Sequence, residues 1–131
     1  MRSRILQIVF FGVSITSLNC ITEPTPQQFI VRVDSLTHSA SVSVDDTIRL
    51  QLFGTIGPDG CHSFSHFETT TTSSELHLTV WGERSEAQIC PTVMVSLDGR
   101  EYSTQASSPG WYFINIHQPD GTVLRDSIQV N

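Results

Sequence analysis

Residues 61–90 read CHSFSHFETTTTSSELHLTVWGERSEAQIC, and this stretch decides the fold. Two extended segments flank a polar turn, and a cysteine closes each end. The second segment, residues 75–81, alternates apolar and polar side chains, which is the pattern of a half-buried strand. The stretch is therefore predicted to be a β-hairpin whose outer ends are tied by a disulfide between Cys61 and Cys90.

Short segments of the same kind recur along the rest of the chain. Apolar and polar side chains alternate over most of residues 29–36, 47–56 and 111–117, and residues 92–97, 100–105 and 123–130 are further predicted strands. Turns rich in Pro, Asp and Gly separate the segments, and no segment has the period of an amphipathic helix. This pattern predicts an all-β fold of seven to nine strands, arranged as an antiparallel two-sheet sandwich of immunoglobulin-like type. A small jelly roll or an open barrel would fit the same strand count.

The penultimate strand begins with the sequence Pro109-Gly110-Trp111-Tyr112. This sequence resembles the start of that strand in many bacterial immunoglobulin-like domains. In those domains an inward tyrosine braces a corner of the fold through its hydroxyl group. The resemblance implies the same role for Tyr112.

The first residues have the features of a secretory signal. Arg2 and Arg4 precede an apolar run at residues 5–15. The run is too short for a membrane-spanning helix, which needs about 20 residues, but it has the length and flanks of a signal sequence. A buried N-terminal strand is disfavoured by the two arginines. We therefore expect residues 1–19 to be a signal peptide.

The signal ends at Ser17-Leu18-Asn19-Cys20, which resembles the lipobox of bacterial lipoproteins with its aliphatic residue one position late. The resemblance implies that Cys20 is lipidated and anchors the exported protein to a bacterial membrane, on its periplasmic or surface face. Ordinary signal-peptidase cleavage near residues 17–19 is the alternative, and it would give a soluble secreted or periplasmic protein.

The number of cysteines agrees with lipidation. The chain has three, and export implies an oxidising compartment in which cysteines pair. A lipid on Cys20 leaves Cys61 and Cys90 as a pair. Residues 20–28 then form an extended, proline-containing linker from the lipidated cysteine to an immunoglobulin-like domain at residues 29–131.

Charge and motifs exclude several functions. The formal net charge is −6, and the chain has no lysine and no basic cluster, which argues against binding to nucleic acid. The sequence has no Gly-x-Ser-x-Gly or His-Glu-x-x-His motif, and its Asp-Gly pairs are typical of turns. We therefore expect a non-enzymatic domain that uses no cofactor.

Three histidines of the hairpin, His62, His66 and His77, raise the question of a metal site. Residues four apart on a strand share a face but lie about 13 Å apart, whereas zinc holds each nitrogen at about 2.1 Å. The strand assignment therefore predicts no metal site here. Histidines on a solvated or half-buried strand face are the expected arrangement.

Trp81 and Trp111 fall on the outward side of their predicted strands, and His77 lies near Trp81. Exposed aromatic side chains stack on sugars or anchor a protein partner, so these three residues are the candidate binding surface. The alternative is that a tryptophan fills the core, as in many immunoglobulin domains. The chain thus resembles small bacterial lipoproteins with a structural or interaction domain, and a carbohydrate- or protein-binding module is the alternative function.

Overall fold

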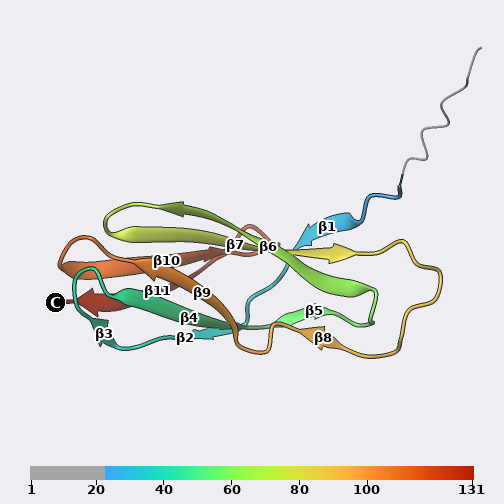
Figure 1. The fold of residues 1–131 in the computed structure, drawn as a ribbon, viewed down its shortest axis with the longest axis horizontal. Helices are drawn as coiled ribbons and strands as arrows, with labels where there is room; N and C mark the ends of the chain where they lie inside the picture. Colours follow the sequence, from blue (N-terminus) through green and yellow to red (C-terminus); the bar gives the residue numbers. More distant parts are fainter. Residues whose placement is uncertain (1–22) are drawn as a thin grey trace, which may run out of the picture.

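The computed structural model describes residues 23–131, and every regular element in this range is a β-strand (Figure 1). The all-β prediction is confirmed. The predicted signal peptide and Cys20 lie outside the described residues. In the described part of the chain no helix is long and apolar enough to cross a membrane. The strands are β1 (Gln27–Ile30), β2 (Ser35–Thr37), β3 (Ser41–Val42), β4 (Thr47–Phe53), β5 (Thr55–Gly57), β6 (His62–Thr71), β7 (Glu75–Arg84), β8 (Val95–Ser96), β9 (Arg100–Gln105), β10 (Gly110–His117) and β11 (Val123–Val130).

The largest sheet has six strands in the order β1-β7-β10-β11-β3, with β6 also paired to β7. Strand β7 is its centre. β6 runs along one edge of β7, and β1 and β10 share the other edge. β1 lies opposite residues 81–84 and β10 lies opposite residues 75–79.

Two strand pairs of this sheet are parallel, β7 with β10 and β11 with β3, so the prediction of antiparallel pairing throughout is wrong. The cause is the connection between β7 and β10. The chain leaves β7 at Arg84 and passes through β8 and β9 before it returns at Gly110. Parallel strands need such a long crossover, whereas β10 and β11 are joined by a short turn and are antiparallel.

The remaining strands form a three-stranded antiparallel sheet, β2-β4-β9, and a two-stranded ribbon, β5-β8. The predicted strand at residues 47–56 is divided at Gly54 into β4 and β5. A side chain at Gly54 would collide with the carbonyl oxygen of Arg32, so this close backbone approach requires glycine. Interruptions of this kind give eleven strands in place of the predicted seven to nine, four of them with only two or three residues.

One apolar core lies between the large sheet and the three-stranded sheet. Alternate residues of β7 and β4 point into it, as the sequence pattern predicts. The largest fully buried side chains are Val31, Ile48, Leu50, Leu52, Leu76, Leu78, Val80, Tyr112, Ile114, Ile116, Ile128 and Val130.

Gln118 is the one buried polar side chain in the range 23–131. Its Nε2 donates to the carbonyl oxygen of Val33 at 2.9 Å, and its Oε1 accepts from the amide of Val33 at 3.1 Å. Val33 lies between β1 and β2, where the chain crosses from one sheet to the other. This crossing divides the single strand predicted at residues 29–36.

Tyr112 is buried on β10, as the resemblance implied. Its hydroxyl lies 3.4 Å from Oγ1 of Thr104 on β9, so it joins the large sheet to the three-stranded sheet. Burial raises the pKa of Tyr112, because the ionised phenolate would be poorly solvated there.

The β6–β7 hairpin is present, and the predicted disulfide between Cys61 and Cys90 is confirmed. Cys61 directly precedes β6, whereas Cys90 lies in the connection from β7 to β8. The bond therefore ties that connection to the base of the hairpin. It closes a loop with a sequence separation of 29 residues.

Candidate binding face

The outward side of the large sheet carries aromatic and imidazole side chains on three strands. On β7 and β10 these positions alternate with the buried residues of the core, so strand geometry places them on the side away from it. We call this surface the outer face. It consists of His66 and Glu68 of β6, Glu75, His77, Thr79 and Trp81 of β7, and Trp111, Phe113, Asn115 and His117 of β10.

Trp81 is half-buried, and its ring lies over His66 of β6. The ring centroids are 6.1 Å apart and the planes differ by 9°. The indole Nε1 donates a 2.8 Å hydrogen bond to Oε2 of Glu68. Trp81 points outward as predicted, but both its polar atom and part of its ring surface already have partners within the protein.

Trp111 and Phe113 are the solvent-exposed aromatic side chains of the outer face. Trp111 is 59% exposed and Phe113 is 45% exposed. They occupy alternate positions of β10 and therefore point to the same side. Neither tryptophan belongs to the core in the described part of the chain, and the alternative of a core tryptophan is not found.

The structure does not bring Trp81 and Trp111 together. Phe113 lies opposite Glu75 in the parallel register, with Trp111 two residues before Phe113 and Trp81 six residues after Glu75. At about 3.3 Å per residue the two tryptophans are separated by roughly 26 Å along the sheet. A single sugar residue cannot contact both.

His77 lies between the two tryptophans and contacts a second histidine. Its Nδ1 is 3.2 Å from Nε2 of His117, and its Nε2 is 3.4 Å from Oε2 of Glu75. His117 is not among the functional residues predicted from the sequence. The alternating pattern of residues 111–117 does place it outward, but only the parallel register, with Asn115 opposite His77, shows that the two imidazoles meet.

The other histidines of the hairpin have separate surroundings. His62 Nδ1 is 2.8 Å from Oδ1 of Asp59, and this hydrogen bond lowers the pKa of the Asp59 carboxyl. Ligand atoms of Asp59, Cys61 and Cys90 lie within 4.8 Å of one another. The two sulfurs are bonded to each other, so this group cannot act as a thiolate metal site.

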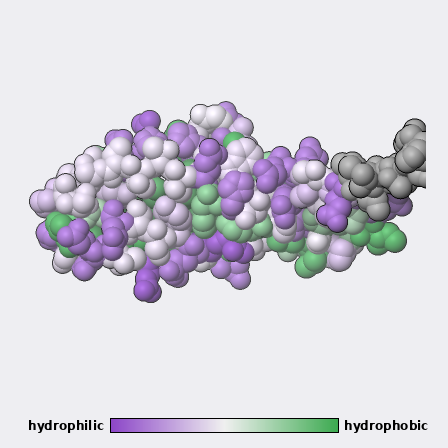
Figure 2. All heavy atoms as spheres, turned by 45° about the horizontal axis from the view of Figure 1, so that its top comes forward, coloured by the Kyte–Doolittle hydropathy of each residue, from purple (hydrophilic) through white to green (hydrophobic). Residues whose placement is uncertain are grey.

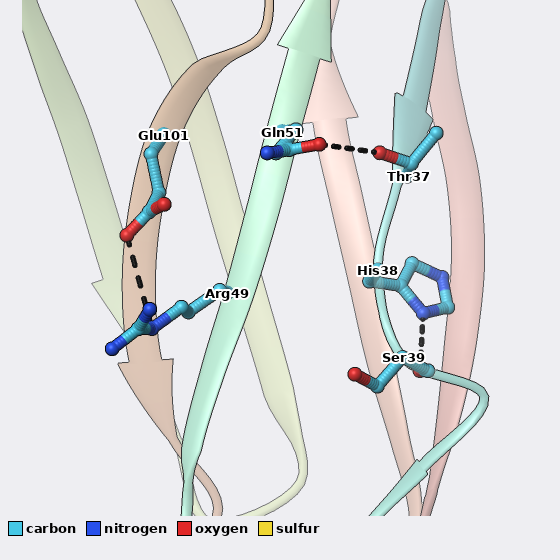
Figure 3. Close-up of a pocket in the computed structure, with 6 residues that line it drawn as sticks. All are labelled: Thr37, His38, Ser39, Arg49, Gln51 and Glu101. Atoms are coloured by element: carbon cyan, nitrogen blue, oxygen red, sulfur yellow. Dashed lines mark hydrogen bonds and ion pairs between the residues drawn. The ribbon is translucent and has the colours of Figure 1, made fainter.

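A hollow of about 360 Å³ lies on the outer side of the three-stranded sheet (Figure 3). Several of its polar side chains already have partners within the protein. Arg49 Nε is 3.9 Å from Oε1 of Glu101, and Thr37 Oγ1 donates to Oε1 of Gln51 at 3.3 Å. No Phe, Tyr, Trp, Leu, Ile or Val lines this hollow, so it offers little to a ligand. Its lining residues are Thr37, His38, Ser39, Arg49, Gln51 and Glu101.

A second hollow, of about 390 Å³, lies beside the imidazole pair. It combines one aromatic wall with polar and charged groups from β7, β10 and β11. This combination makes it the better candidate for a binding site. Its lining residues are Glu75, His77, Phe113, Asn115, Arg125 and Asp126.

Comparison with known proteins gives no relative from which a function could be carried over. No protein-family model, curated protein or solved structure matches the chain. The residues of this chain are therefore the only basis for inferring its function.

Proposed function

We propose that the chain is an exported, lipid-anchored protein of a bacterial envelope, and that its immunoglobulin-like β-sandwich is a non-enzymatic interaction domain. The distribution of cysteines carries this proposal. Cys61 and Cys90 are joined, which leaves Cys20, at the lipobox-like sequence, as the one cysteine outside the pair. Structural disulfides persist in oxidising compartments, and the remaining cysteine stands where a lipid would be attached.

The core supports the sandwich assignment. Inward residues of β4 in one sheet and of β7 and β10 in the other belong to a single apolar cluster. Two sheets that enclose one core are the layer arrangement of a β-sandwich. The buried Tyr112, whose hydroxyl reaches β9, is consistent with an immunoglobulin-like corner.

One end of the domain has an apolar surface suited to the proximity of a membrane. Figure 2 shows apolar residues at the end that carries the β7–β8 connection. Pro24 and Pro26 line a hollow together with Glu86 of this connection, so the start of the described chain lies beside it. An anchored domain would direct this end toward the bilayer, where apolar side chains are favourable. The large apolar side chains exposed on this connection are Ile89, Val93 and Met94.

Metabolic labelling with a fatty acid tests the anchor in a bacterial host that exports and processes the full chain. We expect label on the wild type and none on Cys20→Ser, with the wild type in the membrane fraction. An unlabelled wild type that has been exported and cleaved would refute lipidation.

Alkylation tests the disulfide and the compartment. Cys61 and Cys90 should resist alkylation until they are reduced. Free thiols at both positions in the exported protein would refute folding in an oxidising compartment.

Trp111 and Phe113 favour a second function, the binding of a glycan or protein partner by the outer face. Aromatic side chains of this size anchor both kinds of partner, and the neighbouring hollow supplies polar groups from Asn115 and Arg125. Screening the protein against envelope glycans and envelope proteins tests this function. A genuine partner should bind at least tenfold more weakly to Trp111→Ala, while Trp81→Ala should have the smaller effect. An equal loss of affinity in Trp111→Ala and Trp81→Ala would contradict binding through β10.

A further inference from the structure

We propose that His77 and His117 form a binding site for a divalent transition-metal ion of the Cu²⁺, Ni²⁺ or Zn²⁺ class. The two residues lie on neighbouring strands, β7 and β10, whose register is fixed by backbone pairing. Their imidazole rings approach edge to edge, with 3.2 Å between Nδ1 of His77 and Nε2 of His117. Metal binding at this site would require neither lipidation nor the proposed interaction partner.

The distance between the nitrogens matches that of two ligands on one ion. Imidazole nitrogens bind zinc at about 2.0–2.1 Å, which places two of them about 3.3 Å apart at a tetrahedral angle and about 2.9 Å apart at a right angle. The observed 3.2 Å lies within this interval. The two nitrogens face each other across a hydrogen bond, with ring planes that differ by 23°. An ion about 2.1 Å from both nitrogens would lie about 40° off the line between them, so both partly exposed rings would have to turn by this amount and the shared hydrogen would be displaced.

Glu75 sets the tautomer that such a site needs. Its Oε2 lies 3.4 Å from Nε2 of His77 and accepts the hydrogen on that nitrogen. Nδ1 of His77 then accepts the hydrogen on Nε2 of His117, and a bound ion would take the place of that hydrogen. A metal-binding histidine commonly donates its other N–H to a carboxylate, which orients the ring and increases its basicity. Glu75, His77 and His117 reproduce this arrangement.

The hollow beside His77 would leave coordination positions open. Its charged groups are the carboxylates of Glu75 and Asp126 and the guanidinium of Arg125, so the local charge does not oppose a cation. Asp126 also lies 3.1 Å from Nε2 of His38. With two protein nitrogens as ligands, the remaining positions would be filled by water or by a group of a bound partner.

The ligand set defines which ions should bind. Imidazole suits copper, nickel and zinc, and affinity generally rises from nickel to copper. Calcium and magnesium prefer oxygen ligands and should not bind here. Because metal binding requires neutral imidazoles, acidification should release the ion.

Titration calorimetry of the purified, exported full chain with Cu²⁺ or Zn²⁺ tests the site in a buffer that does not chelate metals. We expect one ion per chain, and at least tenfold weaker binding to His77→Ala and to His117→Ala. Glu75→Gln should weaken binding by about tenfold, because a carboxylate that accepts the second N–H of a metal-binding histidine contributes about 10–100-fold to affinity. Ca²⁺ should give no heat of binding.

His66→Ala is the matched control, because His66 lies on the same face but stacks on Trp81 away from the pair. Circular dichroism should show an unchanged fold in all variants. Electron paramagnetic resonance of the Cu²⁺ form should show coupling to two imidazole nitrogens, and to fewer in each single histidine variant. Metal affinity that is unchanged in both His77→Ala and His117→Ala, or reduced equally in His66→Ala, would overturn the proposal.

Discussion

The side chain of Gln118 hydrogen-bonds the peptide groups of Val33, as a neighbouring strand would. Its side-chain amide donates one hydrogen bond to the Val33 peptide and accepts another, at 2.9 and 3.1 Å. Val33 lies between β1 and β2, where its buried backbone is outside any strand pair. Buried peptide groups must be hydrogen-bonded, so this side chain makes the crossing between the sheets possible.

We predict that Gln118→Ala lowers the free energy of unfolding by about 2–4 kcal/mol. The change leaves the N–H and C=O of Val33 without partners, and each unsatisfied buried group costs about 1–3 kcal/mol. Urea denaturation followed by fluorescence measures the loss. Gln88→Ala, at an exposed position, is the control and should change stability by less than about 0.5 kcal/mol. Equal effects of both changes would contradict the role of Gln118.

The ionised carboxylate of Asp120 should stabilise the folded domain at pH values above about 5. Its carboxylate accepts from the hydroxyl and the amide of Thr122 and from Arg32, and these hydrogen bonds hold the pKa of Asp120 well below its usual value of 3.8. A lowered carboxyl pKa in the folded state stabilises the protein above the unfolded pKa, and this contribution is lost as the pH falls. Asp120→Asn should therefore be less stable than the wild type above about pH 5, with a smaller difference at lower pH.

The control for Asp120 is Asp46→Asn, an exposed aspartate in another turn. Urea midpoints of the three proteins between neutral pH and pH 2.5 give the comparison. A constant difference between the wild type and Asp120→Asn over this range would show that ionisation of Asp120 is not the cause.

The disulfide should contribute substantially to stability. Its loop has a sequence separation of 29 residues, for which the chain-entropy model gives about 3.5 kcal/mol. The double variant Cys61→Ala, Cys90→Ala should lose about this much free energy of unfolding. Reduction should destabilise the wild type similarly and leave the double variant unchanged. A reduced wild type as stable as the oxidised protein would contradict the prediction.

The two tryptophans should differ in their accessibility to a neutral quencher. Trp111 is 59% exposed, whereas Trp81 is half-buried and stacks on His66. Acrylamide should therefore quench Trp81→Phe, which retains Trp111, more steeply than Trp111→Phe. Glu68→Gln should increase quenching of Trp81 in the Trp111→Phe background, because the charged acceptor of its indole N–H is lost. Identical quenching of the two single-tryptophan proteins would refute the greater exposure of Trp111.

The sequence pattern was sufficient to predict the inward faces of the strands. Leu76, Leu78 and Val80 alternate on β7 and are fully buried, and the all-β class follows from repeats of this pattern. Alternation indicates which side of a strand is buried but not which strand lies beside it. The parallel pairing of β7 with β10 therefore could not be predicted, and the contact between His77 and His117 depends on that pairing.

Local irregularity explains why the surroundings of Trp81 were not predicted. The register between β6 and β7 shifts between Phe64 and His66, and this shift places His66 opposite Trp81. A bulge inserts a residue into one strand only, and the bulged strand β6 has no glycine to indicate its position. The outward direction of Trp81 was predictable, whereas its stacking partner was not. Lipidation of Cys20 also stays a prediction, because Cys20 lies outside the residues that the structure describes.

Strand β1 has a consequence for how the domain bears mechanical load. Gln27 lies opposite Arg84 and Ile30 opposite Trp81, so β1 runs antiparallel to β7 from the end of the domain where the described chain begins (Figure 1). Tension on the chain before Gln27 would pull along both strands, across hydrogen bonds that are perpendicular to them. The pairs would then resist in shear and share the load, whereas a strand peeled sideways breaks its pairs one at a time.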